Sequence, residues 1–120
     1  MTWQRQPEVL LTPDPTRPWM AETVAEVALV RGPDGDYYLF FTGFAVGGAE
    51  MAIGVARAAT ITGPYQVRPK PIITAADVDF AAGQVLAPAV LIDATGAHLW
   101  FMGIDAQGSY QIGRADVPPA

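Results

Sequence analysis

The hydrophobic positions of the chain fall in short runs separated by turn residues. The run Thr23–Val30 is rich in Val and Ala, the run Tyr37–Phe44 is strongly aromatic, and Pro33-Asp34-Gly35 lies between them. Val, Tyr, Phe and Thr favour strands, whereas Pro-Asp-Gly favours a turn. The pattern therefore predicts a β-hairpin of two buried strands over residues 23–44.

Further runs predict additional strands over 3–11, 51–57, 65–73, 85–93, 97–103 and 110–115. Prolines interrupt the runs 3–11 and 65–73, which is typical of edge strands because proline has no N–H to donate. With 12 Gly and 11 Pro in 120 residues, short strands and turns are favoured over helices. An all-β protein with negligible helix follows.

The chain also repeats itself in order. Trp19 corresponds to Phe80 and Leu29 to Val90, and further pairs follow along the chain: Gly35 with Gly96, Gly43 with Gly103 and Ile53 with Ile112. A fixed period of this length with four short strands per unit is typical of β-propeller blades. We therefore expect two four-stranded antiparallel blades within one unit, 1–120. Residues 1–62 would form the first blade with an N-terminal closing strand, and residues 63–120 the second.

The alternative architecture is a small sandwich of two similar sheets, which explains the ordered repeat less well. Blades pack face to face, so their middle strands are covered on both sides. This accounts for the continuously apolar stretch Tyr37–Phe41.

Composition narrows the classes of function. The chain is 51% apolar and 16% charged, which fits a folded domain, and its net charge is -5 with only seven scattered basic residues. Nucleic acid is therefore not an expected partner. Cysteine is absent, which excludes disulfides and thiol chemistry. No apolar run is long enough to span a bilayer and no signal peptide is visible, so no membrane partner is expected and a cytoplasmic location is the default.

Glu26 is the residue that fits its surroundings least. It lies within the first predicted strand, between Ala25 and Val27 in an otherwise apolar run. A carboxylate there is costly unless it is paired or faces a polar cavity. The corresponding position in the second repeat is Ala87, so the fold itself does not need an acidic residue at this place.

The stretch from Trp19 to Arg57 resembles a blade of the five-bladed propeller glycosidases, glycoside hydrolase family 43 and its relatives. The resemblance rests on Glu22-Thr-Val-Ala-Glu26-Val-Ala-Leu-Val, Gly35-Asp-Tyr-Tyr-Leu-Phe-Phe-Thr-Gly43, Ile53-Gly-Val-Ala-Arg57 and Gly63-Pro-Tyr65. It implies that Glu26 takes the position of the general acid, although Val27-Ala28 stands where the family often has a small residue and Pro. The second repeat is similar to the next blade, with Gln84 near the place where the family often carries a metal-associated His.

Four residues are thus candidates for a carbohydrate site: Glu26 as general acid, and Trp19, Glu22 and Gln84 as substrate-binding residues. Three of them have a structural alternative. Glu26 can be a strand-end carboxylate that reaches solvent or pairs with a basic side chain, Glu22 can be a solvated loop carboxylate, and Trp19 can be a core residue like most aromatics in strands. A turn role is favoured for Asp14, a loop position without metal ligands for Asp77 and Asp79, and a core or inter-blade position for His98. No metal or cofactor is expected.

The resemblance implies a glycosidase-like propeller fragment that acts on or binds carbohydrate. Family members use two Asp residues besides the Glu, and these are missing from the matching positions, so we expect the isolated chain to be inactive or very weak. The alternative is a lectin-like two-blade module that assembles into a full propeller, and a degenerate propeller used as a protein-interaction surface is a third possibility. Two blades leave apolar faces uncovered, so a homo-oligomer is expected.

Overall fold

The computed structural model describes residues 1–118 and contains seven strands and two short helical turns. The strands are β1 (Thr23–Arg31), β2 (Tyr37–Phe44), β3 (Met51–Ala58), β4 (Gln66–Val67), β5 (Gln84–Asp93), β6 (Gly96–Ile104) and β7 (Tyr110–Val117). The 3-10 turns are η1 (Pro18–Met20) and η2 (Ala75–Asp77). Within residues 1–118, no helix has the length and apolar character needed to cross a membrane.

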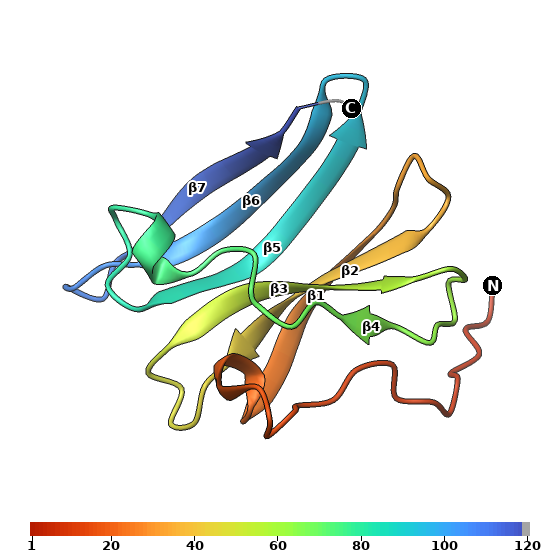
Figure 1. The fold of residues 1–120 in the computed structure, drawn as a ribbon, viewed down its shortest axis with the longest axis horizontal. Coiled ribbons are helices and arrows are strands. Elements are labelled where there is room, and N and C mark those ends of the chain that lie inside the picture. Colours follow the sequence, from red (N-terminus) through yellow and green to blue (C-terminus); the bar gives the residue numbers. More distant parts are fainter. Residues whose placement is uncertain (119–120) are drawn as a thin grey trace.

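The strands form two antiparallel units that match the expected blades (Figure 1). In the first, β1, β2 and β3 pair in order, and β4 pairs with the outer side of β3. In the second, β5, β6 and β7 pair in order. A single parallel residue pair, Met51 with Gln84, joins the two units. The expectation of an all-β fold built from propeller-type blades is confirmed, with β1 and β5 in the predicted inner positions.

Two predicted strands are wrong in extent. Residues 3–11 form no strand: Pro7 has no N–H to donate to a ladder, and the segment pairs with no strand edge within residues 1–118. The predicted strand 65–73 shortens to Gln66–Val67, because prolines at 64, 69 and 71 remove donors that a ladder needs. The second blade consequently has three strands among the described residues rather than four.

The division near residue 62 stays a prediction, and β4 shows how the chain crosses it. Gln66 and Val67 pair with Arg57 and Ala56 of the first blade, although they follow the expected boundary. Ile73 then forms a bridge to Ile53 before the chain enters the second blade. The connection 66–73 therefore belongs to both units.

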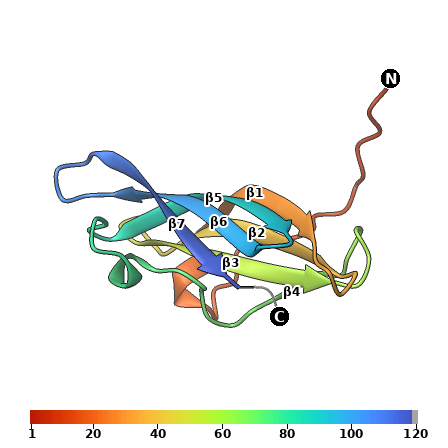
Figure 2. The same cartoon turned by 90° about the horizontal axis from the view of Figure 1, so that it is seen from above.

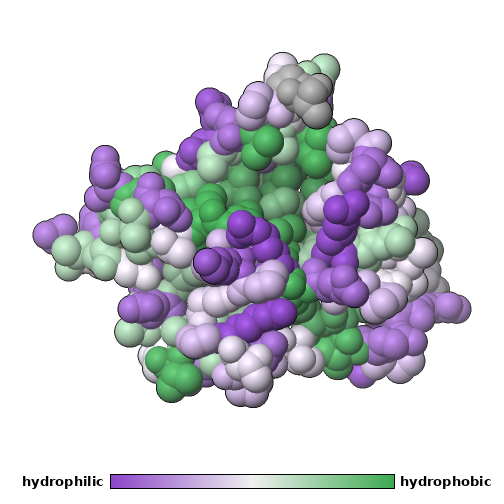
Figure 3. All heavy atoms as spheres, in the orientation of Figure 1, coloured by the Kyte–Doolittle hydropathy of each residue, from purple (hydrophilic) through white to green (hydrophobic). Residues whose placement is uncertain are grey.

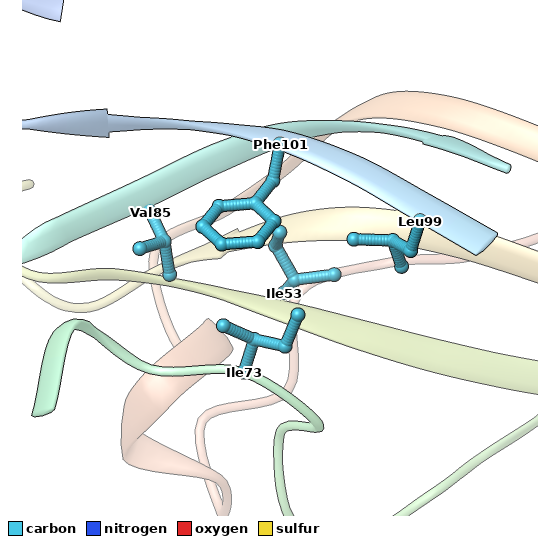
Figure 4. Close-up of a cluster of buried hydrophobic side chains, with 5 residues drawn as sticks. All are labelled: Ile53, Ile73, Val85, Leu99 and Phe101. Atoms are coloured by element: carbon cyan, nitrogen blue, oxygen red, sulfur yellow. The ribbon is translucent and has the colours of Figure 1, made fainter. Parts of the chain in front are cut away.

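The main core lies between the two blades. Ile53 of the first blade is fully buried against Val85, Leu99 and Phe101 of the second, and Ile73 closes the cluster from the connection (Figure 4). Figure 3 shows apolar side chains gathered in the angle between the blades, bordered by polar ones. The first residues of the chain extend away from both blades (Figure 2), whereas Leu10 and Leu11 lie against the first blade.

A second core cluster holds the opposite face of the first blade. Met20, Leu39, Phe41 and Ala56 are buried there, and Leu11, Trp19 and Tyr65 pack against them. The residues of β2 thus face the second blade and this outer cluster alternately, which explains why an uninterrupted apolar run is needed.

Candidate functional site

Both inner strands contain a β-bulge at the same point of the repeat. The register of β1 shifts between Ala25 and Ala28, and that of β5 shifts between Leu86 and Ala89. Glu26 has φ 59° and Ala87 has φ 57°, and these are the two non-glycine residues with positive φ among those described. Such a conformation costs on the order of 1–3 kcal/mol for a residue with a side chain. The same strained geometry therefore presents a carboxylate in one blade and a methyl group in the other.

Glu26 lies at an open hollow of about 300 Å³ on the first blade. The other lining residues are all apolar, namely Leu10, Leu11, Val24, Ala25, Val27, Leu39 and Phe41. The side chain is exposed and forms no hydrogen bond or ion pair with any residue of 1–118. The expected apolar walls are present on one side, while the carboxylate itself is open to solvent and available to accept hydrogen bonds from an outside group.

Thr42 supports the corresponding bulge in the second blade. Its Oγ1 accepts a 2.8 Å hydrogen bond from the backbone N–H of Ala87, and Thr42 is a fully buried polar residue. This role of Thr42 was not predicted from the sequence. The available signal was a hydroxyl at the end of the apolar stretch Tyr37–Phe41, where a buried polar group requires a partner.

Trp19 is held in place by the core of the first blade. Its ring stacks on Phe41 with centroids 5.7 Å apart, and its indole N–H donates a 2.9 Å hydrogen bond to the carbonyl of Pro69. A Cβ added to Gly43 or Gly54 would come within 2.7 Å of the ring. The structure thus gives Trp19 a packing role, and its part in binding a sugar stays a prediction.

Glu22 and Gln84 stand beside the starts of the two inner strands, at one end of the blades. The backbone N–H of Glu22 donates to the carbonyl of Phe44, and its side chain is exposed. The amide nitrogen of Gln84 donates a 2.8 Å hydrogen bond to the carbonyl of Gly48. Gln84 therefore fixes the loop that connects β2 and β3, and a part of Glu22 or Gln84 in binding a ligand stays a prediction.

A larger hollow of about 420 Å³ opens near the same end and was not foreseen from the sequence. Trp19, Glu50, Met51 and Thr74 line it together with Ala and Gly residues of the segment 75–83. Glu50 is its acidic residue, whereas Glu26 is the acidic residue of the hollow on the first blade. The structure therefore divides the four predicted site residues: Trp19 and Glu26 line separate hollows, and Glu22 and Gln84 line neither of these two.

The remaining candidate carboxylates have local structural roles. Asp14 accepts hydrogen bonds from the backbone N–H and hydroxyl of Thr16, which lower the pKa of its carboxyl group. Asp77 caps η2 by accepting from Thr74, and Asp79 is exposed in the following loop. No group of three or more potential metal ligands occurs within residues 1–118.

His98 is a polar link on the second blade, so the expectation of a core or inter-blade position needs correction. Its Nδ1 lies 2.7 Å from a carboxylate oxygen of Asp116, and its Nε2 lies 3.4 Å from Asp93 and 2.7 Å from the hydroxyl of Thr95. The hydrogen bond with Asp116 is the main cause that raises the pKa of the imidazole. The contacts of His98 thus join the turn between β5 and β6 to the last strand, β7.

Several solved glycoside hydrolases contain a similar arrangement of blades. A family 43 β-xylosidase/α-arabinofuranosidase from a compost microbial metagenome, in complex with xylotriose, matches with a TM-score of 0.68 and 18% identity over 78% of this chain. The GH43_1 enzyme from Xanthomonas citri, also in complex with xylotriose, matches with a TM-score of 0.65 and 26% identity over 77% of the chain. An endo-arabinase from Bacteroides thetaiotaomicron matches with a TM-score of 0.62 and 15% identity over 82%.

The matched part corresponds to 31%, 28% and 32% of these three proteins, so the chain spans about a third of their length. No family profile and no curated protein matches the sequence. These comparisons confirm the resemblance at the level of the fold: the chain has the fold of two blades of the five-bladed propeller glycosidases.

Proposed function

We propose that the chain is a carbohydrate-acting blade pair of the glycosidase type, in which Glu26 takes the position of the general acid. The observation that carries this proposal is the inner-strand bulge. A positive φ favours Gly, or Asn among the other residues, yet Glu occupies the position in the first blade. A strained, solvent-open carboxylate at the start of an inner strand is suited to contact a ligand rather than to stabilise the fold.

The solved structures support carbohydrate as the partner. Two of the matching glycoside hydrolases were crystallised with xylotriose. Xylose units present hydroxyl groups, which a carboxylate can bind by accepting hydrogen bonds. We therefore propose a β-xylo-oligosaccharide as the first ligand to test, with Glu22, Gln84 and an edge of Trp19 as additional contacts.

Hydrolysis requires more than Glu26. An inverting glycosidase needs a second carboxylate about 6.5–9.5 Å from the acid to activate water, and a retaining one needs it at about 5–5.5 Å. The hollow at Glu26 contains no other acidic residue among those described. We accordingly propose that the 120-residue chain binds a xylo-oligosaccharide weakly and turns over glycosides very slowly or not at all.

The experiment compares Glu26→Gln with Asp79→Asn, which removes another exposed carboxylate outside both hollows. Binding of xylotriose is measured by NMR titration, and turnover is measured with aryl xyloside and aryl arabinoside substrates. We expect binding that is weakened at least severalfold in Glu26→Gln and unchanged in Asp79→Asn. Equal binding by both variants, or none by the unaltered chain, would contradict the proposal. Turnover that disappears in Glu26→Gln would show instead a working enzyme.

The alternative function is a lectin-like module of two blades that assembles with further blades. The observation that favours it is the close equivalence of the blades, down to the shared bulge and the shared stacking of Trp19 on Phe41 and Phe80 on Phe101. The two functions separate in the same titration: a lectin retains xylotriose binding in Glu26→Gln and shows no turnover in any variant.

A further inference from the structure

The contact between the two blades provides a template for the outer face of the second blade. In the first blade, Phe40, Thr42 and Ile53 face the second blade. The register places Trp100, Met102 and Ile112 at the corresponding positions: Thr42 pairs with Ile53 across β2 and β3, and Met102 pairs with Ile112 across β6 and β7. We call Leu91, Trp100, Met102 and Ile112 the outward face.

The four side chains of the outward face are apolar and at least partly exposed, and the register places Arg114 opposite Trp100 and His98 opposite Leu91 on the same side of the sheet. Ile53 has no exposed surface, whereas Ile112, the same residue type at the equivalent position, is 76% exposed. Trp100 is 36% exposed and Leu91 is 50% exposed. Burying such side chains is favourable, at roughly 25 cal/mol per Å² of apolar surface. The face therefore has the chemistry of an interface.

The segment that covers Ile53 shows what kind of segment fits above Ile112. The backbone N–H of Ile53 donates to the carbonyl of Ile73 at 2.9 Å, and the N–H of Ile72 donates to the carbonyl of Ile53 at 2.8 Å. Leu10 and Leu11 precede Ile72 and Ile73 by 62 residues, the same offset that separates Pro7 from Pro69. The counterpart of the covering segment thus exists at the start of this chain.

The outer edge of β7 also has no partner strand within the described residues. In the first blade, Gln66 and Val67 extend the sheet by pairing with Arg57 and Ala56. The counterparts on β7 are Asp116 and Ala115, which pair only with β6 within the described chain. The counterparts of the short strand are Gln4 and Arg5, which lie in the extended N-terminal segment without a sheet partner (Figure 2). Unpaired edges of this kind readily accept another strand.

We propose that the outward face binds the first blade of a second copy of this chain. Leu10-Leu11 of one copy would pair with Ile112 of the next, and Gln4-Arg5 would extend its β7. Met102 has no hydroxyl, so the contact between copies contains no counterpart of the hydrogen bond between Ala87 and Thr42. Because two different surfaces meet, the contact is head-to-tail, and it builds rings or longer assemblies rather than symmetric dimers. This proposal does not depend on a glycosidase function.

The first test is the solution mass of the 120-residue chain over a range of concentrations, by light scattering and sedimentation. Ile112→Asp places a carboxylate in the proposed interface and is expected to weaken association at least about tenfold, with an unchanged circular dichroism spectrum. Val46→Asp is the matched control, since Val46 is 77% exposed in the loop between β2 and β3. A monomer at all concentrations, or an equal effect of both variants, would overturn the proposal.

The second test identifies which surfaces meet. The chain contains no cysteine, so Leu11→Cys and Ile112→Cys introduce single thiols. Adjacent antiparallel residues have Cα atoms about 4.5–5.5 Å apart, within disulfide range. Mild oxidation of a mixture of the two variants should yield mainly the mixed disulfide dimer. Efficient formation of Ile112→Cys homodimers instead would show a symmetric contact and would overturn the head-to-tail arrangement.

Discussion

The backbone N–H of Ala87 in the second blade donates a 2.8 Å hydrogen bond to the hydroxyl of Thr42 in the first. The bond connects the bulge of one inner strand to the middle strand of the neighbouring blade. It therefore fixes the local conformation of β5 and the relative position of the blades together.

Replacing Thr42 with Val should destabilise the chain by about 1–3 kcal/mol, because the part-buried N–H of Ala87 loses its acceptor while the volume hardly changes. Thr42→Ser keeps the hydroxyl and serves as the control, with a smaller loss from the missing methyl group. Urea denaturation followed by circular dichroism measures both. Equal stability of Thr42→Val and the unaltered chain would show that the hydrogen bond makes no net contribution to the free energy of unfolding.

Replacing Ala87 with Gly should stabilise the chain by up to about 1 kcal/mol, since glycine adopts φ 57° without steric cost. Ala89→Gly, two residues further along the same strand, should destabilise by about 0.5–1 kcal/mol because its backbone is regular. The opposite signs of the two changes in thermal denaturation are the result to look for. Destabilisation by both would mean that the bulge carries no relievable strain.

Gly54→Ala should destabilise the first blade by about 1–3 kcal/mol through overpacking. The new Cβ would lie 2.4 Å from the ring of Trp19 and 2.8 Å from that of Phe41. Gly83→Ala is a suitable control because its nearest neighbour, the carbonyl of Ala49, is 3.3 Å away. Denaturation midpoints give the comparison, and a Gly54→Ala variant as stable as Gly83→Ala would contradict the tight packing of Trp19.

The contact of His98 with Asp116 predicts a pH-dependent stability. The hydrogen bond raises the pKa of His98 above 6.5, so this stabilisation is complete below pH 6.5 and is lost as the pH rises through the folded-state pKa. The pKa of Asp116 is lowered from 3.8, mainly by His98, so its contribution is present above pH 3.8 and is lost on further acidification. His98→Gln should remove the decline in melting temperature above pH 6.5, while Asp14→Asn, distant in the sequence, should leave it in place.

The inner and middle strands could be predicted from sequence because their side chains both favour strands and indicate burial. Tyr37–Phe44 combines strand-forming side chains with apolar character on both faces, and the ordered repeat fixes its counterpart in the second blade. The segment 3–11 could not be placed, since a strand exists only where a neighbouring edge accepts its hydrogen bonds. Its composition is the same whether or not that edge is within reach.

The candidate site was only partly predictable for a similar reason. Glu26 could be singled out because a carboxylate interrupts an apolar run. Its positive φ and its exposure depend on a bulge that the pattern of hydrophobic positions does not reveal. Trp19 was recognised as important, yet sequence cannot distinguish a ring that stacks on Phe41 from one that stacks on a ligand. The hollow beside Glu50 is lined by Trp19, Met51 and small residues of segments far apart in the sequence, and their convergence is a property of the folded chain.

The packing of Trp19 and Phe80 also limits how the sequence of such a protein can be recombined. Trp19 fits only because Gly43 and Gly54 leave room for it, and Phe80 fits in the same way over Gly103 and Gly113. Each aromatic and its two glycines come from three separate segments, so a crossover inside a blade would combine a large ring with a side chain that blocks it. Recombination between related genes should therefore succeed at the connections between blades, and whole blades are the units in which such a chain can be duplicated, lost or exchanged.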